Sequence, residues 1–320
     1  MPTSALRTTT VELTALGTGE RGTQRPFRER RVRSEESPLQ PRDAAGIIDL
    51  SIEGLLARLG PLLFFALAVW LPFRQVEELL GLAGLDEFAL DATSLLWSAL
   101  SVLPQALSAS VVTSVVADVL VDRRAPLRAG FLRGLARTPG VAVLLFCTQI
   151  ATVPLIVLLV VPYFLVLWRT WAAVPIYVLE GESLLSVAER ARASRSLLAY
   201  LASHPRRLAR ALRRSVLLSK GLSAFGRWAL LALIGQLVLG GVLELCAMGL
   251  THPGARDDLR TEVGLSGVFT QLALGAAAAL FLALSACLRA SQMVAYYLDL
   301  RVRREGWDLE LALRGAETRP

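Results

Sequence analysis

Apolar side chains in this chain gather into a few long runs that almost lack charged residues, separated by polar segments rich in arginine and acidic residues. A run of about 18 or more apolar residues predicts a bilayer span, because lipid offers the backbone no hydrogen bonds and only a helix or closed barrel satisfies its own. The runs are unbroken rather than alternating, which favours helices over barrel strands. The pattern therefore predicts an all-α fold, a polytopic transmembrane helical bundle with added interfacial amphipathic helices.

Six spans account for the apolar runs. We expect them at about residues 55–73, 94–120, 141–161, 162–180, 228–250 and 266–288. The third and fourth share one apolar block, which is about twice as long as one crossing requires. Arginine-rich segments border this block on both sides, so the block crosses an even number of times if both segments are cytoplasmic. We therefore predict a tight outer turn near Val161 and Pro162, with a kinked hairpin as the alternative.

The distribution of basic residues predicts the orientation. Residues 121–140 hold five arginines and residues 181–227 hold ten basic residues, whereas the segments 74–93 and 251–265 hold one and two. Basic residues collect on the cytoplasmic side of membrane proteins, which places both termini in the cytoplasm. We therefore attribute the net charge of +7 to basic residues in cytoplasmic segments rather than to a nucleic-acid-binding site. We expect the bacterial cytoplasmic (inner) membrane as the location and the lipid bilayer as the first partner.

Composition divides the chain into a membrane domain and two polar ends. The chain is 54% hydrophobic and 19% charged, and its mean hydropathy is +0.51. Residues 1–45 are rich in Pro, Ser, Thr and Arg and bury too little apolar surface to fold, so we expect a disordered tail. The six-span domain is predicted at 46–313 and a short disordered end at 314–320. Trp228, Tyr296 and Tyr297 are expected in the aromatic belt at the inner membrane surface.

Ionisable side chains inside a span are costly and require a partner or a function. Arg169 is the sharpest case, because it lies near the middle of the fourth span. Its candidate partners are Asp118, Glu244 and the Trp171 carbonyl, which Pro175 leaves without a helical donor. Glu180, on the same predicted helix, is a further candidate intramembrane polar residue. A structural ion pair or carbonyl contact is one interpretation, and a transport role is the other.

Two further spans carry polar or small side chains at helical spacing. One face of the second span holds Ser94, Ser98, Ser101, Gln105 and Ser108. Such a face avoids lipid, so it lines either a helix contact or a wet cavity. The fifth span contains Gln236 and Glu244 at an analogous spacing. The sixth has a ridge of small residues that permits close approach of another helix, formed by Gly275, Ala279, Ala283 and Cys287.

A basic segment before the fifth span has the pattern of an interfacial helix. Between Pro205 and Leu218, one stripe contains Leu208, Leu212 and Val216, and another contains Arg206, Arg210 and Arg213. This spacing suits a helix lying flat on anionic lipid, with the three arginines at the headgroups. The alternative is a straight extension of the fifth span into the cytosol.

The central sequence resembles a known membrane family. The stretch VPYFLVLWRTWAAVPIYVLEGESLLSVAERARASRSLL is similar to the membrane domain named after glycerophosphoryl diester phosphodiesterases, with matching positions at Arg169, Pro175, Glu180 and Gly181. The resemblance extends in outline from Gly46 to Leu313, through IIDLSIEGLLARLGPLL near the start and YYLDLRVRREGWDLEL near the end. It implies a membrane fold. It implies no diesterase activity, because the catalytic barrel of the fused members is not among these residues.

No sequence motif indicates catalysis or a cofactor. The two histidines, His204 and His252, fall in different segments, and no HExxH, CxxC, phosphate-binding loop or GxSxG pattern occurs. We therefore expect a non-catalytic membrane protein that scaffolds or assists an envelope process, together with an unknown membrane protein partner. A transporter of a small solute or lipid, using the polar second span and Arg169, is the alternative. A membrane-embedded enzyme would require Asp118, Glu180 and His204 to converge in a cavity.

Overall fold

The computed structural model describes residues 41–82, 92–121, 125–158, 160–181, 197–251 and 267–306. All described residues belong to one compact unit, which falls within Glu36–Pro320. Every element among these residues is a helix, which confirms the all-α prediction. The predicted tail, apart from its last few residues, and the predicted end at 314–320 lie outside the described residues.

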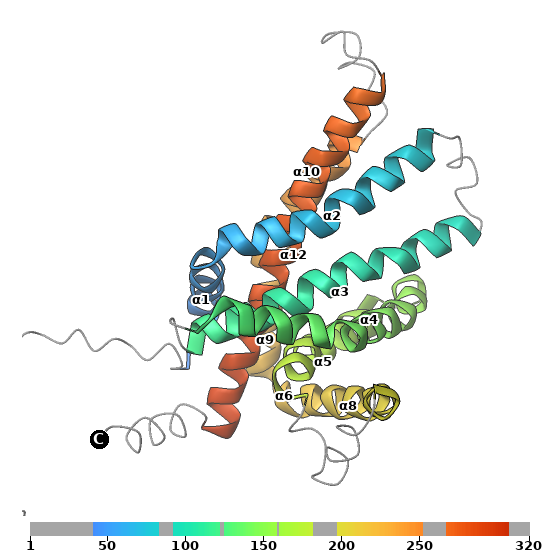
Figure 1. Ribbon diagram of the computed structural model, residues 1–320. Helices are drawn as coiled ribbons and strands as arrows, with labels where there is room; N and C mark the ends of the chain where they lie inside the picture. Colours follow the sequence, from blue (N-terminus) through green and yellow to red (C-terminus); the bar gives the residue numbers. More distant parts are fainter. Residues whose placement is uncertain are drawn as a thin grey trace, which may run out of the picture. The chain divides into compact units, whose positions relative to one another are not determined.

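The described helices follow one another in chain order. Their bounds are α1 Ala44–Leu56, α2 Leu59–Leu82, α3 Ala92–Val121, α4 Leu127–Leu158, α5 Val160–Thr170, α6 Ala173–Glu180, α8 Leu197–Leu218, α9 Leu222–Leu231, the π-helix η2 Ala232–Gly240, α10 Gly241–Thr251 and α12 Gly267–Glu305. In Figure 1, α2, α3 and α4 lie side by side in this order, and the long helix α12 packs across α2 and α3.

Five described helices are long and apolar enough to cross a membrane. They are Leu59–Glu77, Leu100–Val121, Leu127–Ala151, Val161–Glu180 and Leu272–Glu305. A sixth is present if the bent pair Ser203–Leu218 and Leu222–Gly235 counts as one span. The predicted fifth span, at 228–250, is not among the five. Its residues instead belong to three consecutive helical segments, α9, η2 and α10, which contain 10, 9 and 11 residues. These segments follow one another without a gap from Leu222 to Thr251, so together they are long enough for one crossing.

Two helices begin earlier than the apolar pattern predicts. Helix α1 starts inside the expected tail, where the Asp43 side chain accepts a hydrogen bond of 2.8 Å from the Gly46 backbone and so caps its first turn. Helix α4 starts at Leu127, well before the predicted third span at 141. Arginine is a good helix former, so helix α4 includes Arg128 and Arg133 although the hydropathy falls there.

The apolar block divides into two antiparallel parts, in agreement with the prediction of two passes. Helix α4 ends at Leu158 and α5 begins at Val160, close to the predicted turn. Both α5 and α6 pack back against α4. A short break at Trp171 and Ala172 separates α5 from α6 within the Val161–Glu180 span.

Small residues determine where helices approach most closely. The predicted ridge of the last span is buried, with Ala279, Ala283 and Cys287 all at 0% exposure, and the Cys287 thiol lies 4.0 Å from the Leu62 carbonyl oxygen of α2. A Cβ atom on Gly134 of α4 would lie 2.5 Å from the Val111 Cα of α3. Glycine is therefore required there, because a side chain would force α3 and α4 apart.

The aromatic residues expected at the inner surface are instead core residues. Trp228, Tyr296 and Tyr297 are 3%, 0% and 1% exposed. The Tyr296 hydroxyl donates to the Ala224 carbonyl oxygen of α9 at 3.2 Å. The aromatic-belt prediction was wrong for these three side chains, because neighbouring helices rather than lipid surround them.

Candidate functional site

A cluster of charged side chains lies where the ends of α6, α8 and α12 meet. The Glu180 carboxylate, the last residue of α6, is only 7% exposed. The Arg214 Nε of α8 lies 2.9 Å from its Oε2 atom, and the Arg301 Nε of α12 lies 3.7 Å from its Oε1 atom. The Tyr297 hydroxyl of α12 donates to Oε1. One carboxylate thus joins three helices.

A second carboxylate extends this cluster toward the surface. The Arg214 Nη2 lies 2.8 Å from Glu305 Oε1, and the Arg301 Nε lies 2.8 Å from Glu305 Oε2. Two arginines and two glutamates therefore alternate, and their formal charges cancel. We call this set, Glu180, Arg214, Arg301 and Glu305, the Glu180 cluster. A buried carboxylate requires such compensation, because an unpaired buried charge is strongly unfavourable.

One helical turn before Glu180, a second polar contact joins α6 to α8. The Tyr177 hydroxyl hydrogen-bonds with Nδ1 of His204. Gly140 of α4 leaves the space that the tyrosine fills, since a Cβ there would lie 1.9 Å from the Tyr177 hydroxyl oxygen. Burial lowers the pKa of His204 from 6.5, and the positive charges of Arg207 and Arg137 lower it further. The neutral imidazole is therefore favoured in the folded protein.

The structure pairs the other predicted intramembrane carboxylates with arginines. Asp118 of α3 lies 2.7 Å from Arg133 of α4. Glu244 of α10 lies 2.5 Å from Arg289 of α12 and also accepts a hydrogen bond of 3.0 Å from the Ser285 hydroxyl. In each case the carboxylate and the guanidinium come from different helices.

Arg169 has a different partner from those predicted. Its Nη1 donates to the Val216 carbonyl oxygen of α8 at 3.1 Å, and its guanidinium lies 4.2 Å from the centre of the Trp168 ring. The expected contacts with Asp118, Glu244 or the Trp171 carbonyl were wrong, because α8 packs against α5. Val216 is in the last turn of α8, where carbonyl oxygens lack helical donors and the helix dipole favours a cation.

The polar face of α3 lies against α4. Gln149 Nε2 of α4 donates to Gln105 Oε1 of this face at 3.4 Å. On another side of α3, the Ser110 hydroxyl lies 2.8 Å from the Thr138 hydroxyl of α4. Ser101 is partly buried on the polar face, and Ser108 is fully buried. These contacts favour helix packing over a wet cavity for this face. Gln236 is part of η2, and its side chain lies outside the described residues.

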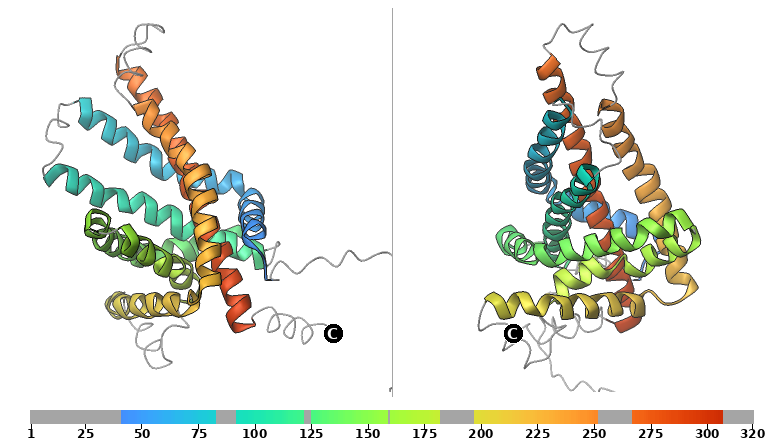
Figure 2. Two further views of the ribbon diagram at one scale, coloured as in Figure 1. Left: turned by 180° about the vertical axis from the view of Figure 1, so that it is seen from behind. Right: turned by 90° about the vertical axis from the view of Figure 1, so that its right-hand side faces the viewer.

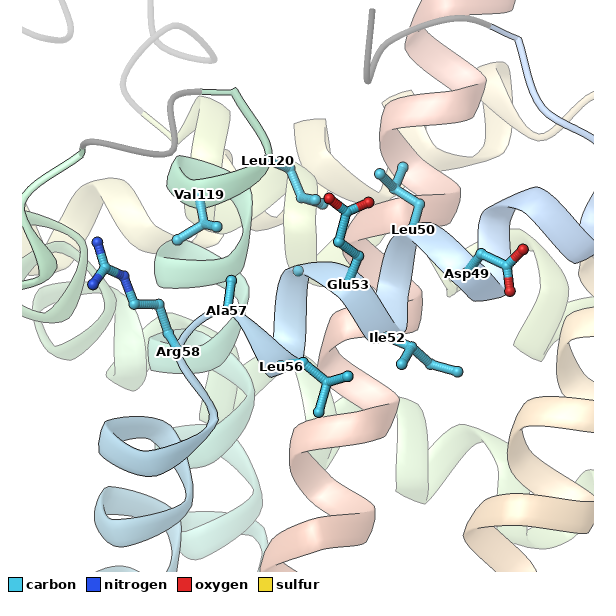
Figure 3. A pocket seen from close by; sticks show the side chains of 10 residues that line it. Asp49, Leu50, Ile52, Glu53, Leu56, Ala57, Arg58, Val119 and Leu120 are labelled. Atoms are coloured by element: carbon cyan, nitrogen blue, oxygen red, sulfur yellow. The ribbon is translucent and has the colours of Figure 1, made fainter. Parts of the chain in front are cut away.

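A surface hollow of about 820 Å³ lies beside α1 and the end of α3. Figure 3 shows Glu53 between Leu50 and Leu120. Arg58 lies at the opposite end of the hollow from Leu50, near Val119. The sequence analysis missed this feature because it depends on α1, which was not predicted. Among the described residues, no group of three His, Cys, Asp or Glu side chains is placed to hold a metal ion.

Sequence reasoning identified Glu180 and missed most of its surroundings. Asp118, Glu180 and His204 have separate partners, which are Arg133, Arg214 and Tyr177. The missed members of the Glu180 cluster are Arg214, Arg301 and Glu305. One signal was present: Tyr297, Arg301 and Glu305 recur every four residues and therefore share a face of α12.

No family model, curated protein or solved structure matches this chain.

Proposed function

We propose that this chain is a non-catalytic protein of the bacterial inner membrane that scaffolds or assists an envelope process, with both termini in the cytoplasm. One observation supports a structural role above others: Asp118, Glu180 and Glu244 each pair with an arginine of another helix. A translocation pathway requires ionisable groups that exchange partners with a solute or proton. In this chain the three carboxylates instead form ion pairs that join one helix to another.

The positions that resemble the membrane domain named after glycerophosphoryl diester phosphodiesterases also make contacts between helices in this chain. Of these positions, Glu180 joins α6 to α8 and α12, and Gly181 leaves space for Arg137, since a Cβ there would lie 2.5 Å from the Arg137 Nη1. Arg169 joins α5 to α8. These positions therefore have packing roles in this chain, which is what a scaffold requires.

Flux and partner capture separate a scaffold from a transporter. The full-length protein is reconstituted into vesicles, and Arg169→Ala and Gln105→Ala variants are compared with wild type for uptake of a panel of small solutes and for lipid exchange. In parallel, proteins cross-linked to the chain in its own membrane are identified. We expect no flux above empty vesicles and a reproducible set of envelope proteins. Solute flux that the Arg169→Ala variant loses would establish the transporter instead.

The orientation is tested by labelling of single cysteines. Cysteines replace Ser4, Ser194 or Glu317 in a background in which Cys147, Cys246 and Cys287 are serine. All three introduced cysteines are expected to resist a membrane-impermeant thiol reagent in intact cells and to react after the cells are opened. Labelling at both Ser194 and Glu317, but not at Ser4, in intact cells would mean that the 141–180 block crosses the membrane only once.

A further inference from the structure

Helix α8 turns sharply away from the helix that follows it. The segments Ser203–Leu218 and Leu222–Gly235 meet at an angle of 105°. Gly221 makes this turn possible, because its φ of +101° is a conformation that other residues rarely adopt. In the right-hand view of Figure 2, α8 lies across the lower end of the bundle, whereas α10 and α12 run upright. This geometry contradicts a straight extension of the fifth span into the cytosol.

One side of α8 is fixed to the rest of the protein. Arg207, Ala211, Ser215 and Leu218 are buried. The Ser215 hydroxyl donates to the Arg169 carbonyl oxygen at 2.6 Å, and the Arg169 guanidinium donates back to the Val216 carbonyl oxygen at 3.1 Å. Arg214 of the Glu180 cluster also lies on this side. These contacts set the rotation of α8 about its own axis and therefore determine which residues face outward.

The outward side of α8 divides into an apolar flank and a basic flank. At about 100° per residue, four apolar residues occupy one half of the outward arc. They are Pro205, Ala209, Leu212 and Val216. The other half contains three arginines, Arg206, Arg210 and Arg213, with Leu217 among them. Beyond the helix end, Leu222 is 88% exposed, which places a large apolar side chain at the bend.

From this arrangement we infer that α8 is a binding site for anionic phospholipids at the membrane surface, with Arg206, Arg210 and Arg213 contacting headgroup phosphates. The apolar flank and Leu222 enter the acyl region beside them. Charge complementarity supports this occupant, because arginines match the geometry of phosphate oxygens. The half-apolar, half-basic surface favours a bilayer over a free anion, which would contact only the basic flank.

This inference does not depend on the scaffold proposal, since a transporter would use the same surface helix. It also goes beyond the sequence pattern, which selects Arg206, Arg210 and Arg213 by their helical spacing but does not show how α8 is rotated against the other helices. The structure directs Arg207 and Arg214 inward and leaves the other three on the outer arc. The site therefore predicts different outcomes for adjacent arginines of one helix.

Native mass spectrometry of the full-length protein tests the site. Phosphatidylglycerol or phosphatidylcholine is titrated into the detergent-purified protein, and bound lipids are counted. We expect wild type to prefer phosphatidylglycerol and the R206Q/R210Q/R213Q variant to lose that preference. A basic residue near an anionic surface contributes about fivefold in affinity, so we expect the triple change to weaken binding by at least about tenfold. The R206K/R210K/R213K variant keeps the charge and retains most of the preference.

Arg128 provides a matched control on another helix. It is an exposed arginine near the start of α4. Arg128→Gln is expected to leave the lipid preference unchanged, whereas Arg213→Gln is expected to reduce it. An equal loss from both substitutions would mean that general surface charge attracts the lipid and would overturn the site. Undiminished preference in the triple glutamine variant would also overturn it, as would full displacement of the lipid by excess inorganic phosphate.

Discussion

The Glu180 carboxylate on α6 and the Arg214 guanidinium on α8 form an ion pair of 2.9 Å, and the carboxylate is 7% exposed. Arg301 of α12 approaches the same carboxylate. The chain separates these residues widely, and their side chains meet only because the ends of three helices converge. The contact therefore forms only when the ends of α6, α8 and α12 are in their native positions.

Replacing Glu180 is expected to destabilise the protein strongly. Glu180→Gln leaves Arg214 and Arg301 with Glu305 as their remaining carboxylate, and loss of a hydrogen bond to a charged group costs about 1.5–3 kcal/mol. The matched control is Glu77→Gln, because Glu77 is the last residue of the Leu59–Glu77 span and pairs with Arg74 of the same helix. Pairs three or four residues apart in one helix contribute about 0.2–0.5 kcal/mol. Apparent melting temperatures in detergent should fall clearly for the first variant and little for the second, and equal shifts would contradict a special role of Glu180.

Close packing at Gly140 gives a prediction that involves no charge. A Cβ on Gly140 would lie 1.9 Å from the Tyr177 hydroxyl oxygen, so Gly140→Ala must displace the tyrosine and its contact with His204. Overpacking of this kind costs about 1–3 kcal/mol. Gly226→Ala in α9 is the control, because a Cβ there meets nothing within 4 Å. We expect a lower melting temperature for Gly140→Ala alone, since alanine at an open helical site is neutral or stabilising.

The sequence predicted what depends on local hydropathy and missed what depends on tertiary contacts. The fourth span was expected at 162–180 and is Val161–Glu180, because apolar residues define it along its whole length. Helix α1 was missed although Ile47 and Leu50 are almost fully buried. It is short and interrupted by charges, so hydropathy alone does not distinguish it from a polar tail. Its capping residue, Asp43, was the available signal.

The candidate site shows the same division. Intramembrane polar residues such as Asp118, Glu180 and Glu244 could be chosen from the sequence, because a charge in an apolar run is conspicuous. Their partners could not be chosen. Arg214 is one of several arginines in a basic helix, and nothing local shows that it faces inward. Tyr297 is of a residue type that is enriched at membrane interfaces. Only the position of α6 makes its hydroxyl a hydrogen-bond donor to Glu180.

The depressed pKa of His204 gives a pH dependence with a defined sign. Burial, followed by the charges of Arg207 and Arg137, lowers this pKa from 6.5. The unfolded state therefore binds the proton more tightly, and stability is fully present above about pH 6.5 and falls as pH decreases below it. Melting temperatures measured between about pH 8 and 5 should show this fall in wild type. His204→Gln should flatten it below pH 6.5, and an unchanged slope in that variant would assign the effect to other groups.

Arg169 and Ser215 are expected to act as one unit that holds α5 against α8. Each side chain bonds a carbonyl oxygen in the other region: Arg169 donates to Val216, and Ser215 donates to Arg169 itself, at 2.6 Å. Both acceptors lie in the last turn of their helices, where no backbone donor is available. Removing the Ser215 hydroxyl therefore takes its donor from the Arg169 carbonyl oxygen, and removing the Arg169 guanidinium leaves the Val216 carbonyl oxygen with only the more distant Ser219 hydroxyl, at 3.4 Å. Either change weakens the remaining contact.

A double-mutant cycle tests this coupling. Arg169→Leu and Ser215→Ala should each insert normally and each lower the apparent melting temperature in detergent. The double variant should lose less than the two single losses added together, because residues in one hydrogen-bond network couple by about 0.5–3 kcal/mol. Arg169→Lys retains a donor and should lose less than Arg169→Leu. Arg169→Glu should have the lowest melting temperature of the four single variants, because it places a negative charge against the negative end of the α8 dipole. Additive losses would show that the two bonds are independent. Unchanged melting in both single variants would show that Arg169 extends to the membrane surface and holds nothing.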